Sequence, residues 1–177
     1  MKIAKSATFI VMGVCGVGKT TVAQLASGRA AGSFLDADDF HSEENVRTMR
    51  EGKPLTDAMR LPWLHSVAAG INAVHHAQPD RRVFAACPAL KRSYRDMLRE
   101  QVPGAVFVYL SANERDIRKR LSERSNHFMP VQMLEGQLAV LEPPTGDEPH
   151  IKIDATVNIE ATVAAVINQI ERFDAFA

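Results

Sequence analysis

The 177-residue sequence has only two cysteines, one tryptophan and two tyrosines, and it carries no net charge. Two cysteines cannot build a disulfide framework, which excludes the class of small secreted domains that depend on one. Basic and acidic residues number 21 each, so the composition lacks the basic excess of a nucleic-acid-binding protein. No segment approaches the ~20 apolar residues of a membrane span, and the first apolar run is too short for a signal peptide. We therefore expect a cytoplasmic protein that binds neither nucleic acid nor membrane.

The sequence does contain a regular alternation of apolar runs with helical patterns. Hydrophobic residues make up 46% of the chain and charged residues 24%, which fits one globular domain over residues 1–177. The apolar runs predict five strands, at residues 8–12, 33–35, 82–87, 105–110 and 151–153. Helical patterns cover residues 19–31, 42–50, 61–76, 92–101, 113–124, 130–142 and 159–173. This alternation favours an α/β fold with a doubly wound, mostly parallel five-stranded sheet.

A glycine-rich loop lies between the first predicted strand and the first predicted helix. Residues 13–20 read Gly-Val-Cys-Gly-Val-Gly-Lys-Thr, which matches G-x-x-x-x-G-K-[ST] at every fixed position. Glycines allow the backbone N–H groups to close around phosphate oxygens at a helix N-terminus. An unliganded strand-to-helix turn is the alternative, and the full match in this context disfavours it. We assign nucleotide binding to Gly13, Val14, Cys15, Gly16, Val17, Gly18, Lys19, Thr20 and Thr21, with Lys19 at the β- and γ-phosphates and Thr20 at Mg²⁺.

A cluster of carboxylates follows the second predicted strand. Asp36 and Asp38 should lie at the carboxyl edge of the sheet, where open α/β sheets bind ligands. We expect Asp36 to support the Mg²⁺ shell through water, and Asp38 to orient an accepting hydroxyl and take its proton. A solvated turn or helix cap is the alternative for an isolated acidic run. The sequence has no guanine-reading N-K-x-D motif and is too short for a motor core, so it indicates a compact phosphotransferase.

Further blocks along the chain are more specific than the loop. They are Asp-Ala-Asp-Asp-Phe-His at 36–41, Gly-Lys-Pro-Leu at 52–55, Pro-Trp-Leu at 62–64, Ala-Leu-Lys-Arg-Ser-Tyr-Arg-Asp at 89–96, His-Phe-Met-Pro at 127–130 and Leu-Glu-Pro-Pro at 141–144. In order and spacing these blocks resemble the gluconokinases of the thermoresistant type. The resemblance covers residues 9 to about 150, most of the chain.

The resemblance implies transfer of the γ-phosphoryl group of ATP to the 6-hydroxyl of D-gluconate, on a fold of the shikimate and nucleoside-monophosphate kinase type. By analogy it also implies a homodimer. Residues 41–76 would cover the substrate and residues 120–137 would form a lid. The implied substrate contacts are Asp38, Arg60, Lys91, Arg95 and His127. Arg120 and Arg124 would contact the nucleotide, and Lys19, Asp38 and Arg124 would be catalytic.

Residue chemistry supports part of this assignment and leaves alternatives open. Arg60 can grip a carboxylate bidentately, and Arg120 and Arg124 share one helical face, although a solvated basic face is their alternative reading. For Trp63 we prefer core packing to stacking on a sugar. Pro88 stands where the family usually has serine, so another aldonate or small polyol acid remains an alternative acceptor. A catalytically inactive nucleotide-binding protein is the alternative from another class.

Overall fold

A single parallel sheet forms the centre of the computed structural model, which describes residues 7–123 and 131–175. Its strand order is β2-β3-β1-β4-β5 and every neighbouring pair is parallel. The strands are β1 (Thr8–Met12), β2 (Ser33–Asp36), β3 (Val83–Ala86), β4 (Val106–Ser111) and β5 (His150–Asp154). The predicted fold class is confirmed. Each predicted strand is present, with bounds shifted by one residue at most.

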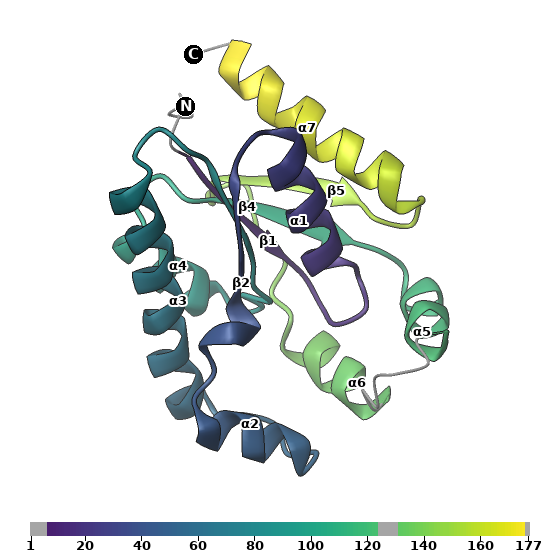
Figure 1. The fold of residues 1–177 in the computed structure, drawn as a ribbon. Helices are drawn as coiled ribbons and strands as arrows, with labels where there is room; N and C mark the ends of the chain where they lie inside the picture. Colours follow the sequence, from purple (N-terminus) through teal and green to yellow (C-terminus); the bar gives the residue numbers. More distant parts are fainter. Residues whose placement is uncertain (1–6, 124–130, 176–177) are drawn as a thin grey trace.

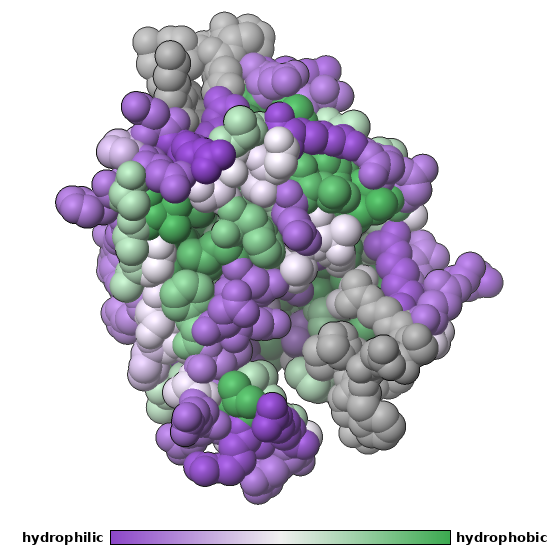
Figure 2. All heavy atoms as spheres, in the orientation of Figure 1, coloured by the Kyte–Doolittle hydropathy of each residue, from purple (hydrophilic) through white to green (hydrophobic). Residues whose placement is uncertain are grey.

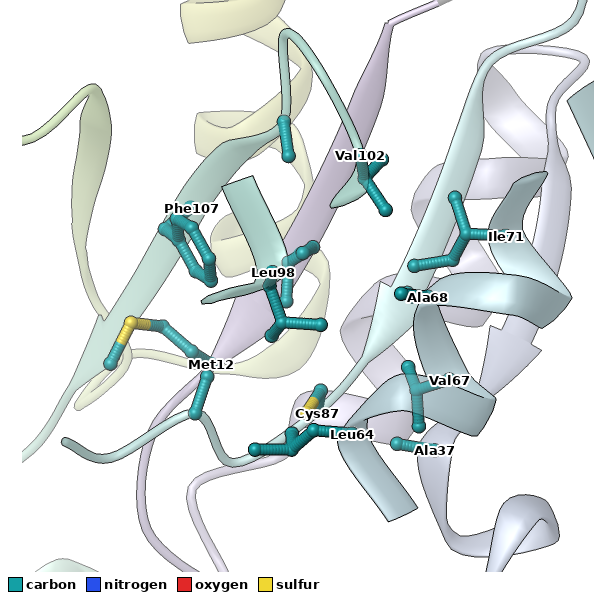
Figure 3. Close-up of a cluster of buried hydrophobic side chains, with 14 of the residues drawn as sticks. Met12, Ala37, Leu64, Val67, Ala68, Ile71, Cys87, Leu98, Val102 and Phe107 are labelled. Carbon is teal, nitrogen blue, oxygen red and sulfur yellow. The ribbon is translucent and has the colours of Figure 1, made fainter. Parts of the chain in front are cut away.

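Helices cover both faces of the sheet. α1 (Lys19–Arg29) and α7 (Ile159–Ala175) lie on one face, and α3 (Asp57–Ala77) and α4 (Arg92–Gln101) lie on the other (Figure 1). Successive side chains of β1 point to opposite faces, so Phe9 joins the first core and Ile10 the second. Figure 3 shows the second core, in which Leu64 of α3 and Leu98 of α4 pack over the sheet.

The remaining helical elements lie at the carboxyl edge of the sheet. A 3₁₀ turn, η1 (Ala37–Phe40), follows β2 directly, and α2 (Glu43–Arg50), α5 (Glu114–Ser122) and α6 (Val131–Val140) complete this edge. In Figure 1, α2 and α6 stand beyond the ends of the central strands. The surface over α2 is mostly hydrophilic in Figure 2, because its charged side chains are exposed. Ser42 caps α2 by accepting from the backbone N–H of Asn45, and serine is a preferred residue at this position.

α3 begins earlier than the sequence pattern indicates. We expected a helix from residue 61 with Pro62 in its first turn, but the helix begins at Asp57 and Pro62 lies inside it. Thr56 caps the true start by accepting from the N–H of Met59 at 3.3 Å. The cap and the buried face of the helix outweigh the hydrogen bond that proline removes. None of the helices within residues 7–123 and 131–175 is both long and apolar enough to cross a bilayer.

Candidate active site

The glycine-rich loop has a shape that side chains would block. Gly13, Gly16 and Gly18 have φ values of 139°, 78° and 103°, in the region that favours glycine. A Cβ on Gly13 would lie 2.7 Å from the carbonyl oxygen of Leu110, and one on Gly16 would lie 2.8 Å from Cγ of Leu121. The loop therefore curls closely against β4 and α5 and forms a cradle of the kind that phosphate groups need.

Lys19 lies across this cradle. Its Nζ donates to the carbonyl oxygen of Val14 at 3.0 Å, which holds the ammonium group over the loop. Burial lowers the pKa of Lys19, while the charges of Asp38 and Asp36 act in the opposite direction. The two carboxylates that the sequence singles out therefore both favour the charged form of this lysine.

Thr20 and Asp36, the two residues expected at Mg²⁺, lie in contact with each other. The Thr20 hydroxyl donates to Oδ2 of Asp36 at 2.9 Å, and Oδ1 of Asp36 accepts from the backbone N–H of Asp38 at 3.1 Å. Among the residues that the structure describes, no group of three or more His, Cys, Asp or Glu side chains could hold a metal ion. One hydroxyl and one carboxylate fit Mg²⁺, which usually keeps several waters and binds substrate phosphates in such sites.

Asp38 lies at the open side of the site. Its side chain is 76% exposed, so a ligand has free access to the carboxylate. Partial loss of water around the group, together with the charge of Asp36, raises the pKa of Asp38, whereas His41 and Lys19 act to lower that pKa. A carboxylate with a raised pKa is a better proton acceptor, which suits the role expected of Asp38.

A pocket of about 380 Å³ lies beside the loop. It is lined by Gly16, Gly18, Thr21, Arg120, Glu123 and the residues that follow β5. Arg120 donates to the carbonyl oxygens of Ala155 at 2.5 Å and Val157 at 3.2 Å, so it joins α5 to the loop after β5. The exposed side chains of Val157 and Ile159 give the pocket an apolar wall suited to a flat base. Our sequence reading missed residues 155–159, although their place after the last strand was a usable signal.

Arg60 and Lys91 lie near the start of α3. Nε of Arg60 donates to the carbonyl oxygen of Leu55 at 3.2 Å. Burial lowers the pKa of His41, and the charge of Arg60 adds a smaller effect in the same direction. Nζ of Lys91 contacts both carboxylate oxygens of Asp57, at 2.9 and 2.7 Å. Lys91 is therefore already paired with an anion, and a substrate carboxylate would have to share or replace that anion.

Arg95 does not take the position expected of a substrate contact. The residue has no exposed surface, and its Nε and Nη2 donate to the two carboxylate oxygens of Glu148 at 2.7 and 2.8 Å. Its Nη1 donates to the carbonyl oxygens of Ala89 and Leu90, both at 3.1 Å. The guanidinium is thus engaged by protein groups and braces the loop after β3, where Ala89 has a positive φ of 41°. No local pattern in the sequence indicates that Glu148, 53 positions away, pairs with this arginine.

Two predicted residues, Arg124 and His127, lie outside the described residues. The lid predicted over residues 120–137 is therefore described only at its two ends, in α5 and α6. α6 also contributes a contact to the site that the sequence analysis did not identify. The backbone N–H of Cys15, in the phosphate cradle, donates to Oε1 of Gln137 at 2.6 Å.

Comparisons with known proteins agree with this geometry. Residues 10–132 match the family model described as "AAA domain". The chain is 38% identical to the gluconokinase of Gluconobacter oxydans, over 93% of this chain and 92% of that protein. It is also similar to the crystal structure of a gluconokinase from Sinorhizobium meliloti, with a TM-score of 0.86 and 35% identity over 97% of this chain and 95% of the other.

A more distant comparison identifies the fold alone. The chain aligns with a shikimate kinase from Bacteroides thetaiotaomicron with a TM-score of 0.60 and 14% identity, over 93% of this chain and 98% of that one. The wider fold is therefore that of the small P-loop kinases, as the sequence predicts. The family follows from the sequence identity, which exceeds 30% over nine-tenths of both chains: this chain belongs to the gluconokinase family.

Proposed function

We propose that this protein is a cytoplasmic enzyme that transfers the γ-phosphoryl group of ATP to the 6-hydroxyl of D-gluconate, giving 6-phospho-D-gluconate. The observation that carries the proposal is the hydrogen bond from Thr20 to Asp36. It joins the phosphate cradle of β1 to the end of β2, where Asp38 stands open to an acceptor. Donor site and acceptor-facing carboxylate thus lie at one edge of the sheet.

Five of the described residues at this edge have a defined task in the proposed reaction. Lys19 neutralises charge on the β- and γ-phosphates as the bond to the leaving oxygen breaks. Thr20 and Asp36 would hold Mg²⁺, which when bound neutralises further phosphate charge. Asp38 orients the 6-hydroxyl and accepts its proton, and Arg60 supplies a cation for the carboxylate of the sugar acid.

Pro88 is compatible with this acceptor site. The contact of Pro88 with the phosphate cradle uses its carbonyl oxygen, which accepts from the N–H of Gly13 at 3.3 Å. That contact does not need the backbone N–H that proline lacks. A serine hydroxyl would nevertheless be absent, so other aldonates belong in any test of the acceptor.

A coupled assay of ADP release over a panel of acceptors tests the proposal. The panel contains D-gluconate, other aldonates, shikimate and AMP, with and without Mg²⁺, and ³¹P NMR locates the phosphate on the product. We expect turnover that depends on a sugar acid and is fastest with gluconate. A clear preference for a non-aldonate would overturn the acceptor, and nucleotide binding without turnover on any acceptor would make the chain a nucleotide-binding protein. Lys19→Ala is the control that removes phosphoryl transfer.

A further inference from the structure

His41 lies directly after η1, and its ring is held in place from one side by an aromatic side chain. The ring stacks on Trp63 with centroids 4.4 Å apart and planes inclined by 13°, and the His41 side chain is only 6% exposed. Trp63 is itself fixed, because its Nε1 donates to the carbonyl oxygen of Ala37 at 2.7 Å. The plane of the imidazole ring is therefore fixed. The hydrogen-bond partners of its two nitrogen atoms then determine what the ring can do.

The Nδ1 edge faces Asn45, which is almost fully buried. Nδ2 of Asn45 donates to the carbonyl oxygen of Met59 at 3.2 Å, and a carbonyl can only accept, so this contact sets the orientation of the amide. The same Nδ2 lies 3.3 Å from Nδ1 of His41 and has a second hydrogen to donate. Nδ1 must then accept, which places the proton of a neutral ring on Nε2.

The Nε2 edge faces the carboxylate of Asp38. Nε2 lies 3.8 Å from Oδ1 of Asp38, which is longer than a hydrogen bond. Because the side chain of Asp38 is exposed, a short movement of that side chain would bring the two atoms within hydrogen-bond distance. Contacts between catalytic groups are often long in ligand-free structures and shorten when substrate binds. A residue needed only for packing would not require a buried amide to fix its tautomer.

We propose that His41 is a positioning residue that donates from Nε2 to Oδ1 of Asp38 and leaves Oδ2 to face the acceptor hydroxyl. The inference rests on the proposed function, since it takes Asp38 as the acceptor-facing carboxylate. His41 itself transfers no group. Burial lowers the pKa of His41, in keeping with a neutral ring that donates from Nε2.

Two substitutions distinguish the role of the Nε2–H donor of His41 from that of its aromatic ring. His41→Phe keeps an aromatic ring against Trp63 but has no donor, whereas His41→Gln places an amide N–H close to the position of Nε2. We expect His41→Phe to lower kcat at least about tenfold with the KM for the acceptor changed by less than about threefold. His41→Gln should recover most of that loss. Equal melting temperatures for the two variants would show that the difference lies in the site.

A double-mutant cycle with Asp38→Asn tests whether His41 acts through Asp38. In the Asp38→Asn background, His41→Phe should lower kcat by less than about twofold. If the kcat losses of the two single variants multiplied in the double variant, the two residues would act independently and the proposal would be overturned. A rise in KM with kcat unchanged would also overturn it, because it would indicate that His41 contacts the sugar acid directly. The cycle is run with whichever acceptor the wild type phosphorylates. If gluconate is not the acceptor, the assay of the wild type shows this, and the result of the cycle does not depend on it.

Nitrogen-15 NMR of the histidine rings gives a reading that needs no turnover. The signals absent from His41→Phe belong to His41, and they should report a neutral ring protonated at Nε2. Asp38→Asn should shift that Nε2 signal. A ring protonated at Nδ1, or an Nε2 signal that ignores Asp38→Asn, would overturn the proposal even if gluconate were the wrong acceptor.

Discussion

The backbone N–H of Cys15 and the side-chain oxygen of Gln137 form a 2.6 Å hydrogen bond inside the phosphate cradle. Cys15 lies in the loop between β1 and α1, whereas Gln137 comes from α6. N–H groups of such loops are the donors that phosphate oxygens use. In this structure the glutamine therefore occupies a donor that a bound nucleotide would take, and α6 is tied to the loop at the same time.

We expect Gln137→Ala to bind MgADP about two- to tenfold more tightly than the wild type. One neutral hydrogen bond, of about 0.5–1.5 kcal/mol, no longer has to be exchanged for the nucleotide. Titration calorimetry measures the change directly. Glu135→Ala is the matched control, because Glu135 lies on the same helix but pairs with Arg118. Weaker binding by Gln137→Ala would instead mean that the glutamine contacts the nucleotide.

Asp36 and Asp38 should respond differently to the same small change. Asp38→Asn should lower turnover by ~10²-fold or more, the lower range for a positioned general base, with nucleotide affinity close to normal. Asp36→Asn should raise the Mg²⁺ concentration needed for half-maximal rate, because Asp36 is the carboxylate bonded to Thr20. Steady-state kinetics over a range of Mg²⁺ concentrations distinguish the two. Near-full turnover by Asp38→Asn would remove Asp38 from the acceptor site.

Gly70 in α3 shows how packing, rather than backbone freedom, can require glycine. A Cβ at this position would lie 2.5 Å from ring atoms of Phe40, the last residue of η1. We expect Gly70→Ala to destabilise the protein by about 1–3 kcal/mol, despite the better helix propensity of alanine, and to lower kcat by shifting η1. Urea unfolding and kinetics measure both effects.

Gly28→Ala is the matched control for that substitution. Gly28 lies in α1, and a Cβ there would have no neighbour within 4 Å. The alanine should therefore leave kcat unchanged and raise the free energy of unfolding by up to about 1 kcal/mol. If both glycines behaved alike, the contact with Phe40 would not be the cause.

Glu148 should make stability depend on pH in the acid range. Burial alone would raise the pKa of Glu148, but hydrogen bonds from Arg95 and Arg99 lower it from 4.5 to about 2. A carboxyl whose pKa is lower in the folded state stabilises the protein above its unfolded pKa. This contribution should therefore be complete above about pH 4.5 and lost as the pH falls towards 2.

Glu148→Gln tests this contribution. At neutral pH the variant should be destabilised by about 3 kcal/mol or more, because it leaves the buried Arg95 without its anion. Between pH 5 and 2.5 its free energy of unfolding should fall less steeply than that of the wild type. Asp80→Asn is the control, since Asp80 is an exposed carboxylate in the turn before β3. Parallel curves for Glu148→Gln and the wild type would contradict the role given to Glu148.

Local patterns in the sequence determined a large part of this protein. The spacing of glycines in residues 13–18 predicts the cradle because all three adopt φ values that other residues avoid. The alternation of apolar strands with helices predicts the parallel sheet, since parallel strands need long crossover connections, which are usually helices. Thr20 and Asp36 could be placed together for the same reason, because Thr20 follows β1 and Asp36 ends β2 at the same edge of the sheet.

Only the tertiary structure decided which side chains meet when the chain folds. Arg95 finds its anion 53 positions away, and Cys15 finds Gln137 at a separation of 122. Such pairs depend on how helices settle on the sheet, and no local propensity encodes them. The same holds for the plane of His41, which is set by a ring on α3. Sequence motifs thus identify the chemistry at the sheet edge, whereas packing over long separations determines which groups are free to perform it.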